Sequence, residues 1–182
     1  MDSSGAFSVL LALILLTFSA FGQQSKRDEG IDLYRAGKFT EAVTLLIEAT
    51  AADRTDRQAW VYLAAAYKHL GNDKESLKAF KSSLATKKSE PLKYDKPEKI
   101  TSKYTPGIKG DDSSPLSDYA VAVELCSDGT VGIIIPYMTS FFERRQAIID
   151  TAKKIKFEPA VKDGKPVTVI HVIEYTFGSS RF

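Results

Sequence analysis

The first half of the chain contains an internal repeat of 34 residues, and this feature constrains the fold more than any other. Gly37 and Gly71 lie 34 positions apart, and the segment "LYRAGKFTEAVTLLIEAT" (33–50) aligns around them with "YKHLGNDKESLKAFKSSL" (67–84). Apolar residues recur three and four positions apart in both segments, which is the spacing of one helix face. We therefore predict two helical hairpins, each turning at its glycine.

The second repeat carries the clearer pattern of small and large residues. Small residues at Ala42 and Ala64 would let neighbouring helices cross closely. The large residues that would fill the space between helix pairs, and that are the candidate packing or groove residues, are Trp60, Leu63, Tyr67 and Phe80. In period and in the order of these positions, residues 26–86 resemble two tetratricopeptide repeats.

Two repeats are fewer than the three that usually make a self-sufficient stack. The open face after Leu84 must then be covered by the next domain, by a short extra helix or by a partner. A concave peptide-binding surface and a structural spacer both fit the pattern, and we favour the spacer.

Residues 1–22 are typical of an export signal. The run "AFSVLLALILLTFSAFG" (6–22) is apolar but shorter than the ~20 residues of a membrane-spanning helix, and it ends with small residues at Ala20 and Gly22. No Lys or Arg precedes the run, so an uncleaved anchor is the alternative. We predict a periplasmic protein, or else one anchored in the inner membrane and facing the periplasm, with membrane contact only through this segment.

Charge content argues against a nucleic-acid-binding protein, and cysteine content excludes an intramolecular disulfide. The 25 Lys and Arg residues nearly balance the 23 Asp and Glu residues, and no basic cluster with interleaved aromatic residues indicates a nucleic-acid partner. Cys126 is the only cysteine, so an intramolecular disulfide is impossible. We interpret it as a small buried residue within a strand, with a reactive or intermolecular thiol as the alternative.

The second half begins after a linker. Residues 87–115 lose the helical periodicity and are typical of a connector, with a short strand predicted around 99–103. In the domain that follows, residues 116–182, "DYAVAVEL" (118–125) and "VGIIIPY" (131–137) have strand character and flank the turn sequence "SDGT". This pattern predicts a β-hairpin.

An amphipathic helix and a long strand complete the second half. The helix is predicted to end at Phe157, and its apolar face is formed by Phe141, Ile148, Ala152 and Ile155. After a turn at Asp163-Gly164, the last strand runs from Val167 to Phe177. The chain directions place this strand beside the first and antiparallel to it, which gives an antiparallel sheet of order 2-1-3 with the helix on one face. The predicted fold class is α+β.

The last strand lies at the edge of this sheet, so its outward backbone N–H and C=O groups have no partner within the sheet. No proline interrupts it, and Glu174 is its only acidic or basic residue apart from His171. We predict that it binds an extended peptide by strand addition, the alternative being that the linker or a second copy of the protein covers the edge. The predicted contact residues are Val167, Thr168, Val169, Ile170, His171, Val172, Ile173, Glu174 and Tyr175.

Residues from about 118 to 177 resemble the C-terminal domain of TonB, the periplasmic energy transducer of Gram-negative bacteria. The resemblance lies in "SDGTVG" (127–132), "AIIDTAKKIKFEPAVKDGKPV" (147–167) and "VIEYTF" (172–177). It implies one helix on a three-stranded antiparallel sheet. It also implies that the last strand recognises a short extended segment of an outer-membrane receptor or transporter, in support of transmembrane transport. The alternative function is a tetratricopeptide-type scaffold for protein–protein interaction, with the sheet used for packing or dimerisation.

We predict no catalytic site, no metal site and no cofactor, and hence no enzyme. The sequence has no nucleophile elbow, phosphate-binding glycine loop or paired-carboxylate spacing. Two distant histidines and one cysteine do not make a zinc site. We interpret His171 as a buried, hydrogen-bonded side chain rather than a switch or ligand, and His69 as solvent-facing.

Overall fold

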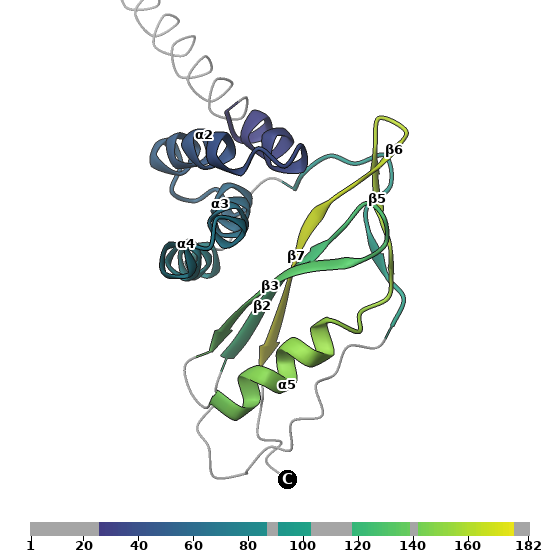
Figure 1. The fold of residues 1–182 in the computed structure, drawn as a ribbon. Helices are drawn as coiled ribbons and strands as arrows, with labels where there is room; N and C mark the ends of the chain where they lie inside the picture. The colour runs from purple at the N-terminus through teal and green to yellow at the C-terminus, as the bar shows by residue number, and fades with distance from the viewer. Residues whose placement is uncertain (1–25, 87–90, 103–117, 139–141, 177–182) are drawn as a thin grey trace, which may run out of the picture.

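The computed structural model describes residues 26–86, 91–102, 118–138 and 142–176, which form an α+β fold in three layers (Figure 1). The helices of the first half form one layer, an antiparallel sheet of three strands forms the middle layer, and helix α5 covers the other face of the sheet. None of the helices within these described ranges has the length and hydropathy needed to span a membrane. The predicted export signal, residues 1–22, lies outside the described residues.

The first half consists of two helical hairpins, as predicted. A helix over residues 26–35, called the leading helix below, is followed by α2 (Phe39–Ala52), and α3 (Arg57–His69) is followed by α4 (Asp73–Ala85).

The two hairpins turn with the same backbone geometry. Gly37 and Gly71 have φ values of 76° and 72°, in the left-handed region that glycine enters without strain. In both turns the residue after the glycine donates its N–H to the carbonyl five positions earlier, over 3.0 Å at Lys38 and 2.9 Å at Asn72. This closure is the Schellman motif, and its recurrence shows that the 34-residue period of the sequence is also a period of the structure.

Close helix packing explains the small residues of the repeat. Ala42 and Ala64 are fully buried. A Cβ atom at Gly30 would lie 2.9 Å from Cγ of Leu46, so the leading helix approaches α2 closely only because Gly30 has no side chain. Leu46 and the equivalent Phe80 are both fully buried.

The sheet has the strand order β3-β2-β7, with β2 at Asp118–Leu125, β3 at Val131–Met138 and β7 at Val169–Thr176. Both neighbouring pairs are antiparallel, which confirms the predicted order 2-1-3. Gly129 has a φ of 84° in the turn between β2 and β3, at the predicted hairpin.

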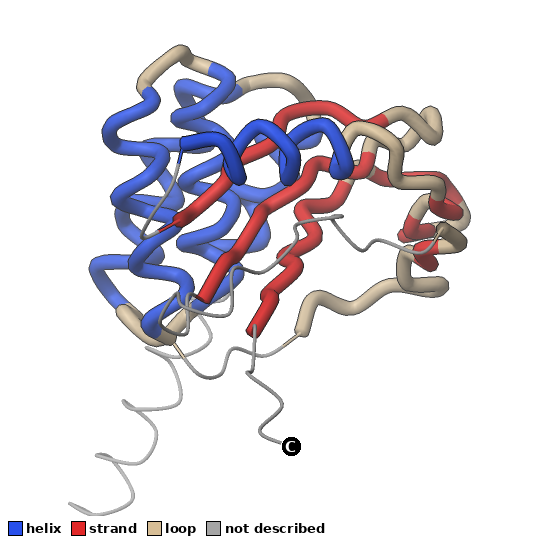
Figure 2. The backbone as a smooth tube through the Cα atoms, turned by 90° about the horizontal axis from the view of Figure 1, so that it is seen from below, coloured by secondary structure: helices blue, strands red, loops and turns tan. Residues whose placement is uncertain are grey.

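The sheet that contains β2 has helices on both sides (Figure 2), and alternate residues of β2 are buried in different clusters. Val121 and Val123 are buried in the cluster with Ile148 of α5 (Phe142–Ala152). Ala120 and Ala122 are buried in the cluster formed by the helices of the first half. The second half of the same chain therefore packs on the helical hairpins, which was one of the three coverings considered from the sequence.

Helix α5 ends at Ala152, so the predicted end at Phe157 is wrong. The reason is that the following segment pairs with the linker. The N–H of Thr101 donates to the carbonyl of Lys156 over 2.8 Å, and β4 (Phe157–Glu158) pairs with β1 (Lys99–Ile100). The short strand predicted around 99–103 is present as β1, although it covers only the first two of those residues.

The predicted strand from Val167 to Phe177 is divided in the structure. β6 (Lys165–Val167) pairs with β5 (Ala160–Lys162) across the predicted turn, where Asp163 and Gly164 have φ values of 53° and 72°. β7 begins only at Val169, because Thr168 forms hydrogen bonds with other parts of the chain. The carbonyl of Thr168 accepts a hydrogen bond from Nε of Arg35 over 3.2 Å, and its Oγ1 accepts one from the N–H of Ser127 over 3.2 Å. Phe177 lies outside the described residues.

Cys126 lies just after β2 rather than within a strand. It is half-buried at the hairpin turn, where its N–H donates to the carbonyl of Thr130 over 2.9 Å. Partial burial, with the nearby carboxylate of Glu124, raises the pKa of the thiol. The prediction of a buried residue within a strand is therefore wrong.

Candidate functional site

β7 is paired on one side only within the described part of the chain. Each of its residues from Val169 to Thr176 lies opposite a residue of β2. None of the described residues pairs with the opposite side of β7, which we call the outer flank. The strand is therefore an edge strand, as predicted.

A proline in β3 determines which residues of β7 direct their backbone N–H and C=O groups to the outer flank. Val121 of β2 lies opposite Pro136 of β3 and opposite Ile173 of β7. Because proline has no N–H, Val121 and Pro136 occupy a non-hydrogen-bonded position, and the backbone groups of Val121 point toward β7. Ile173 is thus bonded to β2. Since the pattern alternates, the residues of β7 that direct N–H and C=O to the outer flank are Ile170, Val172, Glu174 and Thr176.

One end of the outer flank is occupied by α3. Tyr62 is fully buried, and its hydroxyl lies near the backbone of Ile170 and near Arg35 and Tyr94, but none of these groups reaches it in hydrogen-bonding geometry. Burial raises the pKa of Tyr62, so the hydroxyl stays protonated. Val172, Glu174 and Thr176 are the outward-directed residues beyond this contact.

The predicted contact residues are therefore only partly brought together. Val169 to Tyr175 lie in β7, although the side chain of Tyr175 lies outside the described part. Val167 belongs to the β5–β6 hairpin, opposite Ala160, and Thr168 uses its carbonyl and hydroxyl within the chain. Both residues were wrongly assigned to the edge, because the sequence does not show the interruption at Thr168.

Charged side chains flank β7. Arg57 of α3 forms an ion pair with Glu174. Nδ1 of His171 lies 2.8 Å from Oε1 of Glu98 in the linker. Although partial burial opposes ionisation, the hydrogen bond with His171 holds the pKa of Glu98 below its usual range. His171 is hydrogen-bonded as predicted, but its side chain is 34% exposed rather than buried.

The helical half has a groove of its own. The groove has a volume of about 750 Å³ and lies between α2, α3 and α4, with no sheet residue in its lining. Of the four predicted packing or groove residues, Trp60, Leu63 and Tyr67 line it, whereas Phe80 is fully buried in the core.

A buried carboxylate joins the two halves of the molecule. Glu124 lies on the helix-facing side of β2 and is 6% exposed. Its Oε1 accepts a hydrogen bond from the Tyr34 hydroxyl over 2.5 Å and lies 3.1 Å from Nε2 of His69. Its Oε2 accepts the N–H of Ile133 over 3.0 Å. We call Glu124, Tyr34 and His69 the interlayer cluster.

The interlayer cluster contradicts the prediction that His69 faces solvent. The ring of His69 stacks on Phe39, with centroids 4.0 Å apart, and its side chain is only 24% exposed. Although burial opposes ionisation of Glu124, the hydrogen bonds from His69, Tyr34 and Ile133 hold its pKa below the usual range. Burial, followed by the same carboxylate, raises the pKa of Tyr34, so that its hydroxyl remains a donor.

A local irregularity of the sheet accommodates this carboxylate. The register of β2 against β3 shifts between Val123 and Leu125, and the N–H of Ile133 is taken by the Glu124 side chain instead of a carbonyl in the ladder. A Cβ at Gly132 would overlap the carboxylate. The sequence signal was available: an acidic residue alternates with alanines on one face of a strand, and a glycine stands across the hairpin.

No protein-family model matches the chain, and no curated protein is significantly similar to it. Among the described residues, no group of three or more His, Cys, Asp or Glu side chains is placed to hold a metal ion.

Proposed function

We propose that the protein binds an extended segment of a partner protein by strand addition to the outer flank of β7. The observation that carries the proposal is that β7 pairs with β2 alone among the described residues, with backbone groups of Val172 and Glu174 directed outward. An incoming strand would extend the sheet by one strand.

The expected affinity is modest. Three outward residues, Val172, Glu174 and Thr176, each with one N–H and one C=O, offer up to six hydrogen bonds. At about 1 kcal/mol net for each bond, the ladder would supply at most about 6 kcal/mol, which corresponds to a Kd of about 40 μM. Side-chain contacts beside β7, such as those with the Arg57–Glu174 ion pair, would supply the remaining affinity and the selectivity.

The resemblance to the TonB C-terminal domain supports a biological setting for this binding. In that setting the protein is exported by residues 1–22, faces the periplasm, and binds a periplasmic segment of an outer-membrane receptor or transporter. The competing function is a tetratricopeptide-type scaffold, which is favoured by the groove between α2 and α4.

The test uses one position and two substitutions. Val172→Pro removes an outward N–H while leaving the bonds to β2, and proline is tolerated at such edge positions. Val172→Ala loses more side-chain packing but keeps the N–H, so it is the matched control. Binding is measured by fluorescence anisotropy with labelled peptides from the periplasmic N-terminal segments of outer-membrane receptors, and folding is checked by circular dichroism.

Strand addition predicts that Val172→Pro weakens peptide binding about tenfold or more, while Val172→Ala stays within about threefold of the wild type. If Val172→Pro leaves binding intact while Trp60→Ala and Tyr67→Ala abolish it, the scaffold function replaces the one proposed.

A further inference from the structure

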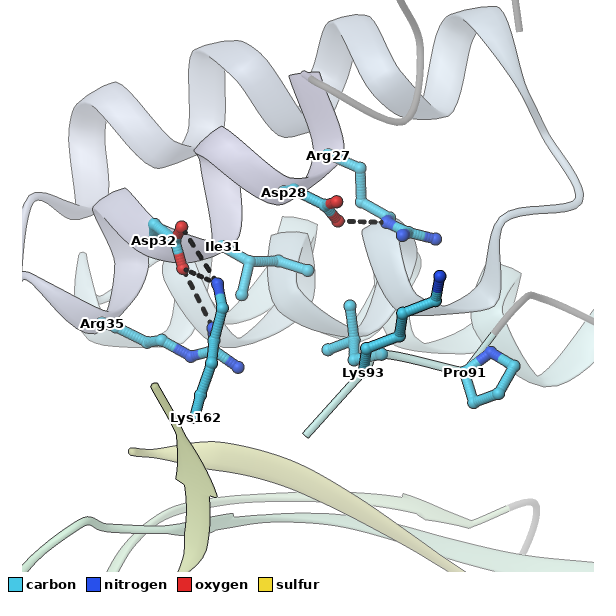
Figure 3. A pocket seen from close by; sticks show the side chains of 9 residues that line it. Arg27, Asp28, Ile31, Asp32, Arg35, Pro91, Lys93 and Lys162 are labelled. Carbon is cyan, nitrogen blue, oxygen red and sulfur yellow. Dashed lines mark hydrogen bonds and ion pairs between the residues drawn. The ribbon is translucent and has the colours of Figure 1, made fainter. Parts of the chain in front are cut away.

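A small polar cavity lies where the leading helix, the start of the linker and the β5–β6 hairpin meet (Figure 3). Its volume is about 210 Å³. Its lining residues are Arg27, Asp28, Ile31, Asp32, Arg35, Pro91, Leu92, Lys93 and Lys162. The cavity is separate from the outer flank of β7 and from the groove of the helical half.

The lining of the cavity carries excess positive charge. It contains four cationic side chains and two carboxylates, which leaves a net charge of +2. Both carboxylates are already paired: Asp28 accepts from Nε of Arg27 over 2.9 Å, and Asp32 contacts both Arg35 and Lys162. Asp56, which does not line the cavity, forms a longer ion pair with Arg27 over 3.6 Å, and counting it lowers the net charge from +2 to +1. A further anion would neutralise this remaining positive charge.

Arg27 and Arg35 differ in how fully they are bonded. Arg35 donates to Asp32, to the carbonyl of Thr168 and to the hydroxyl of Tyr94. Arg27 has a side chain only 5% exposed, yet within the described ranges it donates a single hydrogen bond, through Nε.

The outer nitrogens of Arg27 are the available donors. Oδ2 of Asp56 forms an ion pair with Nη1 over 3.6 Å, a separation that is beyond hydrogen-bonding distance. No hydrogen bond from these terminal nitrogens to another described residue competes with a ligand, and a bond from a guanidinium to an anionic oxygen is stronger than a bond between neutral groups.

Lys93 provides a second unpaired cation at the same end of the cavity. It is exposed, and no carboxylate of the described residues forms an ion pair with it. Figure 3 shows its amino group directed toward the guanidinium of Arg27. An oxyanion held between these two cations would be stabilised by both of them.

We propose that this cavity binds the oxyanion group of a small ligand, a phosphate or a carboxylate, between Arg27 and Lys93. The outer nitrogens of Arg27 form a planar fork that matches two oxygens of such a group, and Lys93 closes the site from the solvent side. Lys162 and Arg35 contribute positive potential but are already bonded. The cavity has room for the charged group and a few further atoms.

The first measurement is ligand-dependent melting of the full chain, because a ligand that binds only the folded protein raises the melting temperature. Inorganic phosphate and succinate are titrated separately, each against sodium chloride at equal ionic strength. One of the two is expected to raise the melting temperature saturably while chloride does not, and the stronger of them identifies phosphate or carboxylate as the recognised group. Equal responses to all three salts would overturn the proposal.

Substitutions then assign the effect to this cavity. Isothermal titration with the stronger anion compares Lys93→Ala with Lys74→Ala, an exposed lysine of α4 that removes the same charge elsewhere. Lys93→Ala is expected to raise Kd about tenfold and Lys74→Ala by less than about twofold. Equal effects of the two variants would show general electrostatic attraction and overturn the site.

Arg27 is tested by spectroscopy of the wild-type protein, because replacing a buried arginine risks unfolding. The side-chain Nε–Hε signal of Arg27 in a ¹H–¹⁵N spectrum is expected to shift with the same Kd as the calorimetric titration. An Arg27 signal that does not move at saturating anion would also overturn the site.

Discussion

The two faces of β2 bind their neighbouring layers in different ways. Toward α5, the strand presents Val121 and Val123, both fully buried among apolar side chains. Toward the helices of the first half it presents Ala120, Ala122 and the carboxylate of Glu124. The face of β2 toward α5 is held by the burial of apolar side chains. The face toward the helices of the first half is held by close packing of small residues and by the hydrogen bonds of the interlayer cluster.

This difference indicates which of the two interfaces fixes the position of the helical hairpins relative to the sheet. Apolar packing is tolerant of small rearrangements, whereas a buried carboxylate requires its donors in place. We infer that the interlayer cluster sets the register of the helical hairpins on the sheet, and that the α5 face contributes mainly burial. The adjacent residues Val123 and Glu124 allow the two faces to be compared directly.

The largest effect is expected for Glu124→Ala. This change leaves the Tyr34 hydroxyl, His69 and the N–H of Ile133 without their acceptor, and each buried group left without its partner costs about 1–3 kcal/mol. Urea unfolding measures the loss of stability. A loss below about 1 kcal/mol would contradict the role assigned to the cluster.

Val123→Ala is expected to cost about 2–3 kcal/mol, from two lost methyl groups and the cavity they leave against α5. The two variants should also perturb different layers. Amide shifts in a ¹H–¹⁵N spectrum are expected around Ile148 and Ala152 for Val123→Ala, and around His69 for Glu124→Ala. Overlapping shift patterns would show that the two faces do not act separately.

A double-mutant cycle isolates the bond between the halves. Tyr34→Phe combined with Glu124→Gln is expected to show a coupling free energy of about 1–2 kcal/mol, because Tyr34 donates to the carboxylate over 2.5 Å. Tyr67 lies in the groove of the helical half, so Tyr67→Phe is the control. Its change in the free energy of unfolding should be additive with that of Glu124→Gln.

The smallest expected effect is a pH dependence. The pKa of Glu124 is lower in the folded protein than its usual value, so its ionised form contributes stability above that usual value. This contribution is lost as the pH falls from about 5 through the folded pKa. Urea midpoints between pH 6 and pH 3 should fall less steeply for Glu124→Gln than for the wild type. The slope that remains in the variant includes Glu98, whose pKa is also lowered.

Local pattern was enough to predict most of the elements. The helical hairpins turn at Gly37 and Gly71, and the sheet has the order expected from strand directions. Both features follow from interactions within about ten residues or from chain direction, which a sequence displays directly.

The errors arose where distant segments meet. The end of α5 at Ala152 depends on pairing of β4 with β1, and the interruption at Thr168 depends on a hydrogen bond from Arg35. For the candidate edge, the sequence predicted Val169 to Tyr175 but could not reveal that Tyr62 lies against Ile170. These contacts join residues far apart in the chain, so no local pattern indicates them.

The sequence by itself determined the helical repeat, the hairpin turns and the two-sided alternation of β2, because each depends on backbone geometry and on the spacing of apolar residues. Only the tertiary structure decided that the sheet packs against the helical hairpins, that Glu124 and His69 meet between them, and that Arg27 and Lys93 face one cavity. The physical reason is that a charged side chain has no intrinsic preference for one distant partner. Its surroundings are set when the apolar faces of the two halves come together and bury it.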